Sequence, residues 1–162
     1  MLRSLRVITA LTVAVLAVAF ATEDKGEPGG RASEAHPPSE LIQQGEAQLA
    51  AQDIDGAIAT LTQAVAADPE STLAHTRLGG AYLLGQRYNS AIEQFQQAIG
   101  LAPDNAGAFI GMGMAYLHGG ETGPARAAFT EAKRLAPDKA ADLDELIGRI
   151  DQGNATPQAP RP

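Results

Sequence analysis

The stretch AIEQFQQAIGLAP, residues 91–103, decides the fold, because variants of it also occur at 57–69 and 125–137. Each copy begins with alanine and has a bulky apolar residue four positions later. A second alanine follows three positions further on, and each copy ends with proline. The copies follow one another at a period of 34 residues. Repetition at this length predicts stacked supersecondary units that share their apolar faces, rather than one closed core.

The segment before each copy is repeated in the same register. Gly45, Gly79 and Gly113 are 34 residues apart, and Tyr82 and Tyr116 occupy matching positions. Glycine and alanine let two helix backbones approach closely, while the bulky residue fills the space beside them. Proline cannot continue a helix, so it marks the turn into the next unit. The pattern therefore predicts two amphipathic helices in each unit.

This register resembles the tetratricopeptide repeat (TPR) family, in which Leu-Gly, Tyr, Ala, Phe and Pro recur at fixed offsets. The third unit has Met in place of the Leu, and the first unit lacks both the Leu and the Tyr. The resemblance covers about residues 38–150 and implies an all-α, right-handed solenoid of three helical hairpins plus a C-terminal capping helix. The matching residues are Leu78, Gly79, Tyr82, Ala91, Phe95 and Pro103 in unit two, and Met112, Gly113, Tyr116, Ala125, Phe129 and Pro137 in unit three.

The register also predicts where the units and helices lie. The polar segments 68–71 and 104–105, which end with Ser71 and Asn105, are expected to provide the capping groups of the helices that follow them. A stripe of Leu and Ile residues near the C-terminus, at helical spacing, predicts the capping helix. The predicted domain is 39–151, with repeats at about 38–71, 72–105 and 106–139 and the capping helix at 139–151. The predicted helices form a first hairpin over 39–67, followed by helices at 72–84, 89–101, 105–118 and 122–135.

The N-terminus predicts export. Arg3 and Arg6 precede an apolar stretch at 7–20, and residues 19–21 have the small-x-small form of a signal-peptidase site. The stretch is shorter than the about 20 residues that a membrane-spanning helix needs. We therefore expect residues 1–21 to be a signal peptide or, alternatively, an uncleaved inner-membrane anchor. The repeats would then be periplasmic or secreted, or would face the periplasm from the membrane.

Glycine, proline and polar residues dominate two flanking segments, at 22–38 and 152–162. Such segments cannot bury enough apolar surface to become ordered. We expect a disordered linker and a disordered tail there.

The composition argues against catalysis and metal binding. The chain has no cysteine, which excludes disulfides and thiolate metal sites. Its histidines, His36, His75 and His118, are scattered without a partner at a metal-ligand spacing. We expect His75 to pack between helices. No Gly-x-Ser-x-Gly elbow or phosphate-binding loop occurs in the sequence. We therefore expect no enzyme activity, no cofactor and no metal.

The charge argues against nucleic acid as a partner. Removal of residues 1–21 leaves 12 − 2 = 10 basic and 19 acidic residues, and therefore a formal charge of 10 − 19 = −9. Such a surface repels a polyanion and also reduces affinity for anionic lipid. We therefore expect a protein partner, and membrane contact only through the N-terminal segment if that segment is not cleaved.

The first helix of each unit carries apolar residues that its own hairpin does not use, such as Ile110 and Met114. In TPR proteins such residues line a concave groove that takes up a peptide or a helix, although they could instead pack neighbouring helices together. Gly80 and Gly111 are expected to leave room beside this groove. The predicted groove residues are Ile42, Leu49, Leu73, Arg77, Leu83, Leu84, Ile110, Met114 and Leu117.

The chemistry of the predicted groove narrows the ligand. Family members that grip a C-terminal carboxylate use Lys, Arg and Asn on this surface, whereas here Arg77 is the only nearby cation. The resemblance therefore implies a scaffold or adaptor of the cell envelope that binds an apolar peptide or an amphipathic helix. Alternatively, the groove residues form an interface between copies of a self-associating structural protein.

Overall fold

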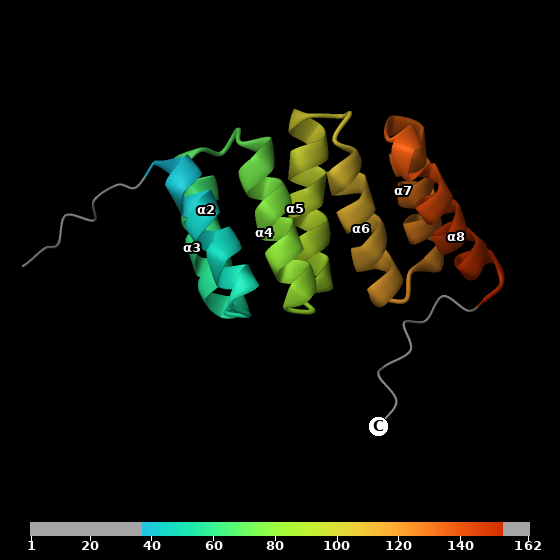
Figure 1. Cartoon of the computed structure of the whole chain (residues 1–162), viewed down its shortest axis with the longest axis horizontal. Helices are drawn as coiled ribbons and strands as arrows, with labels where there is room; N and C mark the ends of the chain where they lie inside the picture. The colour runs from blue at the N-terminus through green and yellow to red at the C-terminus, as the bar shows by residue number, and fades with distance from the viewer. Residues whose placement is uncertain (1–36, 154–162) are drawn as a thin grey trace, which may run out of the picture. The chain divides into compact units, whose positions relative to one another are not determined.

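The computed structural model describes residues 37–153, which form seven α-helices and one short 3₁₀ helix. The predicted signal segment, nearly all of the predicted linker and most of the predicted tail lie outside the described residues. Figure 1 shows the helices side by side, with α2 and α3 at one end of the row and α8 at the other. In chain order the elements are α2 (Pro38–Ala50), α3 (Ile54–Ala67), α4 (Thr72–Leu84), α5 (Tyr88–Leu101), α6 (Ala106–His118), α7 (Thr122–Leu135), η1 (Pro137–Lys139) and α8 (Ala140–Asp151).

Polar caps explain where several of these helices begin. Ser71 Oγ accepts a hydrogen bond from Ala74 N at 3.2 Å at the start of α4. Asn105 Oδ1 accepts one from Ala108 N at 3.1 Å, so α6 begins one residue later than predicted. Each cap satisfies a backbone N–H that has no partner within its helix. Each of the two polar segments predicted to provide a cap does so, through its last residue.

Within each hairpin, a glycine of the first helix lies against a bulky residue of the second helix. A Cβ atom added to Gly79 would lie 2.8 Å from Phe95 Cε1. A Cβ atom added to Gly113 would lie 2.6 Å from Phe129 Cε1. Both distances are too short for a real contact, so the close approach of the two helices requires glycine. The predicted close approach is confirmed.

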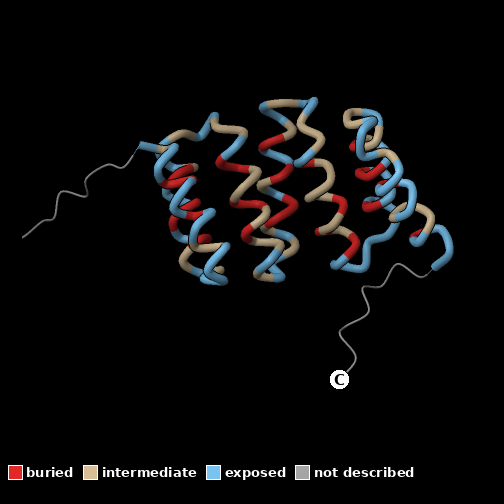
Figure 2. The backbone as a smooth tube through the Cα atoms, in the orientation of Figure 1, coloured by how far each residue is buried: buried red, intermediate tan, exposed pale blue. Residues whose placement is uncertain are grey.

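The hydrophobic core is continuous along the row of hairpins, and Figure 2 shows buried residues on the facing sides of the helices. Tyr82 packs against the buried clusters of the first and second units. Tyr116 packs against those of the second and third. At the C-terminal end, Leu143 and Ile150 of α8 are buried with Phe129 of α7. Each unit therefore buries its apolar surface against its neighbours, and α8 closes the end of the row.

His75 is buried in α4 and joins three segments of the second unit. Its side chain is 7% exposed. Nδ1 lies 2.8 Å from Gln94 Oε1 of α5, and Nε2 lies 3.0 Å from the carbonyl oxygen of Pro69 in the preceding loop. The prediction that His75 packs between helices is confirmed. Its two polar contacts also fix the loop at the start of α4.

Between residues 37 and 153, no helix is both long enough and apolar enough to cross a membrane.

Charged side chains form ion pairs on the outside of the helices. Within α7, for example, Arg134 donates hydrogen bonds to the Glu131 carboxylate, and these hydrogen bonds lower the pKa of that carboxyl.

Candidate functional site

The candidate site lies on the surface formed by α2, α4 and α6, the first helices of the three hairpins, which we call the first-helix face. Helix α4 contacts both α2 and α6. Residues 34 positions apart occupy equivalent places on these helices. One set of equivalent residues on the face is Ile42, Thr76 and Ile110. The set one helical turn further along is Glu46, Gly80 and Met114.

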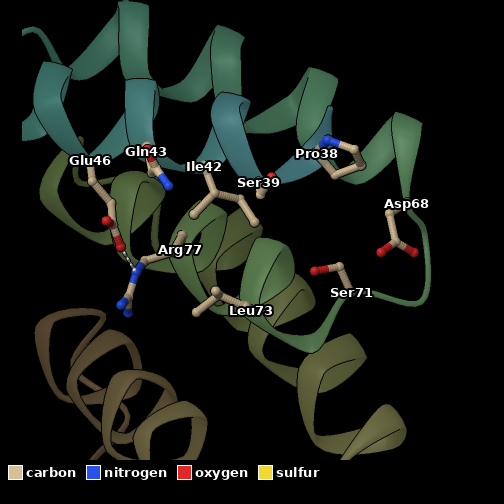
Figure 3. A pocket seen from close by; sticks show the side chains of 9 residues that line it. All are labelled: Pro38, Ser39, Ile42, Gln43, Glu46, Asp68, Ser71, Leu73 and Arg77. Atoms are coloured by element: carbon tan, nitrogen blue, oxygen red, sulfur yellow. Dashed lines mark hydrogen bonds and ion pairs between the residues drawn. The ribbon is translucent and has the colours of Figure 1, made fainter. Parts of the chain in front are cut away.

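A hollow of about 640 Å³ opens between α2 and α4, and we call it the α2–α4 hollow. Figure 3 shows Ser39 and Ile42 of α2 on one side of it and Leu73 of α4 on the other. Ile42 is 7% exposed, whereas Leu73 is 49% exposed. The hollow therefore has an apolar surface of which Leu73 supplies the accessible part.

Charged groups lie at both ends of the α2–α4 hollow (Figure 3). At one end, Arg77 Nε donates a hydrogen bond to Glu46 Oε1, and the two side chains form an ion pair. At the other end, Asp68 Oδ1 accepts a hydrogen bond from Glu70 N at 3.2 Å. Among the described residues, Asp68 has no ion-pair partner. Its negative charge is therefore not compensated locally, unlike that of Glu46.

Three of the predicted groove residues, Ile42, Leu73 and Arg77, come together in the α2–α4 hollow. Ser39 and Gln43 also line the hollow and were not predicted, although the repeat register indicates them, because they lie 34 residues before Leu73 and Arg77. Asp68 was likewise not predicted as a lining residue. Asp68 lies between α3 and α4, where helical periodicity does not apply.

The other predicted groove residues lie in different environments. Leu84 is exposed at the end of α4. Leu117 is 8% exposed and belongs to the core, so it offers a ligand little surface. The remaining residues are half-buried and pack against core clusters: Leu49 in the first unit, Leu83 in the second, and Ile110 and Met114 in the third.

The two glycines expected beside the groove play different roles. A Cβ atom added to Gly80 would meet no heavy atom within 4 Å, so the space beside α4 is open there, as expected. The prediction for Gly111 is wrong. A Cβ atom there would overlap the Phe95 ring, because Gly111 faces α5 across the junction between units two and three. Gly111 therefore permits core packing and leaves no room for a ligand.

Within residues 37–153, no group of three or more His, Asp or Glu side chains is arranged to hold a metal ion. The polar groups of the α2–α4 hollow are suited to recognising a peptide through charge and hydrogen bonds.

Solved structures with this arrangement of helices include proteins in complex with peptides. The first TPR domain of Spaghetti (RPAP3) bound to an HSP90 peptide is 20% identical, with a TM-score of 0.70 over 76% of this chain and 97% of that chain. The Yersinia enterocolitica type III secretion chaperone SycD, in complex with a peptide of the translocator YopD, is 13% identical, with a TM-score of 0.67 over 71% of this chain and 92% of that chain. The protein MamA is 26% identical, with a TM-score of 0.68 over 72% of this chain and 67% of that chain.

The sequence comparisons agree with the fold. No curated protein matches this chain. Two tetratricopeptide repeat family models match it, one over residues 42–106 and the other over 85–150. Together they cover residues 42–150, which is more than half of the 162-residue sequence, and the chain therefore belongs to the tetratricopeptide repeat family.

Proposed function

We propose that this protein is a non-catalytic scaffold or adaptor of the cell envelope that holds a partner peptide or amphipathic helix on its first-helix face. The α2–α4 hollow carries the proposal. It offers an accessible apolar side chain, Leu73, beside polar groups on a surface that the helix packing already fixes. Binding would bury apolar residues of the partner on this preformed surface, and no covalent bond would be made or broken.

Two of the similar structures support a peptide ligand. The RPAP3 domain is bound to an HSP90 peptide, and SycD is in complex with a peptide of YopD. Neither ligand identifies the partner of this chain, because the sequence identities are low. The shared fold supports the coarser inference, which is a surface of stacked first helices that takes up a peptide.

The envelope part of the proposal rests on residues 1–21, with their two arginines and apolar stretch. Cell fractionation with an antibody against the chain should find the protein outside the cytoplasm. Mass spectrometry of that fraction distinguishes the two forms, because cleavage after Ala21 would give a chain that begins at Thr22. An intact N-terminus in the membrane fraction would indicate an anchor. Protein found only in the cytoplasm would contradict export.

Gly80 provides a test of the first-helix face itself. It lies three residues after Arg77 and seven after Leu73, so all three share one side of α4. The Cβ atom of a leucine at this open position would meet no heavy atom within 4 Å, so the substitution adds a side chain to the face. Gly100 of α5 is the matched control, because its added Cβ would also meet nothing within 4 Å. Both substitutions should preserve the fold, since each replaces glycine by a better helix former.

We would crosslink the full-length protein in intact cells and compare it with the Gly80→Leu and Gly100→Leu variants. A partner captured by the wild type and by Gly100→Leu, and lost with Gly80→Leu, is the expected result. Equal capture by both variants would place the interface elsewhere and contradict the proposal. If the only crosslinked species is the protein itself, and sedimentation shows concentration-dependent association, then the chain is instead a self-associating structural protein.

A further inference from the structure

We propose that the α2–α4 hollow is a subsite for a partner segment in which an apolar side chain lies next to a lysine or an arginine. This inference rests on the proposed function, because the hollow is one part of the first-helix face. It goes further by naming the chemistry of the ligand and the residues that would recognise it. Those residues are Leu73 for the apolar side chain and Asp68 for the cation.

The apolar half of the subsite follows from the exposure of Leu73. Leu73 is 49% exposed although it faces Ile42, which is a core residue. A partner side chain placed between these two residues would remove the accessible apolar surface of Leu73 from water. The volume of about 640 Å³ lies within the range of about 300–1,000 Å³ that is usual for ligand sites. The hollow is therefore large enough for an apolar side chain together with a neighbouring residue.

The cationic half of the subsite follows from a difference between the carboxylates at the two ends of the hollow, because only one of them has an ion-pair partner among the described residues. Glu46 is neutralised by Arg77, its ion-pair partner. Asp68 accepts one backbone hydrogen bond and, within the described part of the chain, has no cation beside it. A lysine or arginine of the partner could supply the missing positive charge. A partner carboxylate would instead need Arg77, which is already bound to Glu46, so an acidic ligand is disfavoured.

The charge of the surrounding half of the molecule favours the same ligand. Residues 37–104 contain 8 acidic and 2 basic residues, a net charge of 2 − 8 = −6. Both of these basic residues form ion pairs, Arg77 with Glu46 and Arg87 with Asp55. Residues 105–153 contain 7 acidic and 5 basic residues, a net charge of 5 − 7 = −2. The more negative half therefore surrounds the hollow and attracts a cationic segment.

The same charges disfavour a second copy of this chain as the occupant. Two copies that met at this surface would bring two regions of net charge −6 together. Like charges across an interface reduce affinity, whereas a basic partner gains affinity and a faster association.

The first experiment is a selection from a random peptide library displayed against the full chain. We expect the enriched peptides to share an apolar residue within one or two positions of a lysine or arginine. A synthetic peptide of the enriched sequence, labelled for fluorescence anisotropy, then serves as the probe. Replacing its basic residue with glutamine should weaken binding. An enriched pattern that lacks basic residues would overturn the inference while leaving the proposed function intact.

Two leucines of similar exposure test the apolar half. Leu73 is 49% exposed in the hollow, and Leu101 is 42% exposed at the end of α5. Leu73→Gln should weaken binding of the probe about fivefold, since roughly half of a leucine side chain is available for burial there. Leu101→Gln should leave the affinity unchanged. Equal affinities of the two variants would contradict the assignment of Leu73.

Two carboxylates test the cationic half. Asp68→Asn removes the charge but keeps the Oδ1 atom that accepts from Glu70 N, so the local turn is preserved. Glu93→Gln, at an exposed position of α5, is the control with the same change in charge. Asp68→Asn should weaken binding about two- to fivefold at low salt, and the loss should shrink at about 1 M NaCl. If the two variants bind the probe equally at low salt, Asp68 does not hold the cation.

The outcomes separate this inference from the proposed function. Peptides whose binding is lost with Gly80→Leu but retained with Leu73→Gln and Asp68→Asn would bind elsewhere on the first-helix face. The proposed function would then stand, and the subsite would be wrong. If the selection enriches no peptide, or if the enriched peptides bind Gly80→Leu as tightly as the wild type, then peptide binding on this face is contradicted and the subsite fails with it.

Discussion

Buried apolar residues hold both junctions between hairpins together, but the junction between the first and second hairpins differs from the next in its additional contacts. At the first junction, two ion pairs connect neighbouring units, Glu46 with Arg77 and Asp55 with Arg87 at 2.8 Å. All four side chains are at least partly exposed. Exposed pairs of this kind contribute between about 0 and 1 kcal/mol each and are screened by salt.

The second junction has glycine at both positions equivalent to the Glu46–Arg77 pair, namely Gly80 and Gly111. Gly111 lies directly against the Phe95 ring. Asn105 Nδ2 also donates a hydrogen bond to Thr76 Oγ1 at 3.0 Å across this junction. Gly111 and Asn105 therefore add aromatic packing and a partly buried hydrogen bond to this junction, neither of which depends strongly on salt.

The difference follows from one residue of the second helix in each unit. At equivalent positions of their second helices, unit one has Leu61 and unit two has Phe95. The residue 16 positions after Leu61 is Arg77, whereas the residue 16 positions after Phe95 is Gly111. The larger ring occupies the space that a side chain at position 111 would need. Both junctions are stabilised by buried apolar residues, and the identical repeat register adds exposed ion pairs at the first junction and close glycine–aromatic packing at the second.

The largest expected effect comes from filling the space at the second junction. Gly111→Leu should lower the free energy of unfolding by about 1–3 kcal/mol, because the new side chain overlaps the Phe95 ring. Arg77→Leu, at the equivalent position of the first junction, should cost less, since a side chain is already accommodated there. Urea unfolding followed by circular dichroism measures both. If Gly111→Leu lowered the free energy of unfolding less than Arg77→Leu, the second junction would not be the more closely packed of the two at this position.

A smaller effect is expected from the polar contact at the second junction. Asn105→Ala removes both the cap on Ala108 N and the hydrogen bond to Thr76, and should cost about 1–2 kcal/mol. Asn105→Asp keeps an oxygen for the cap but cannot donate to Thr76. Ser71→Ala, at the equivalent cap of the first junction, loses the cap alone. Thermal melts should rank Asn105→Ala as the most destabilised of the three variants, and an equal loss for Ser71→Ala would show that the Thr76 bond adds nothing.

The smallest effect is expected from the ion pairs of the first junction. Glu46→Gln should lower the free energy of unfolding by less than about 1 kcal/mol at low salt. The difference from the wild type should vanish at about 1 M NaCl, where the Debye length is about 3 Å. Denaturant unfolding at the two salt concentrations provides the measurement. A loss that persists at high salt would mean that Glu46 contributes more to this junction than an exposed charge.

Much of the fold could be predicted because the repeat register states the same packing requirement three times. Gly79 against Phe95 and Gly113 against Phe129 follow from spacing alone, since each pair lies within one hairpin. Ser71 and Asn105 were recognisable as caps because their side chains satisfy backbone groups only a few residues away. These interactions are local in sequence, so a single period contains all the information they need.

The candidate site was harder to predict, because its residues depend on contacts between units. Gly111 illustrates the difficulty, since its sequence position suggested open space in the groove whereas it packs against Phe95 of the preceding unit. Asp68 was missed as a lining residue because it reaches the hollow from a connection between helices. Sequence periodicity describes helix faces, and it does not determine which face a neighbouring unit covers.

The repeat pattern alone is enough to identify a TPR solenoid with three hairpins and a capping helix. It could do so because helix pairing, close approach at glycine and termination at proline are encoded within each 34-residue period. Which apolar residues of the first helices remain accessible depends on the packing between units, which the repeat pattern does not specify. Leu83 and Leu117 occupy equivalent positions, yet Leu83 is half-buried whereas Leu117 is buried in a cluster with Leu143 and Ile150 of α8.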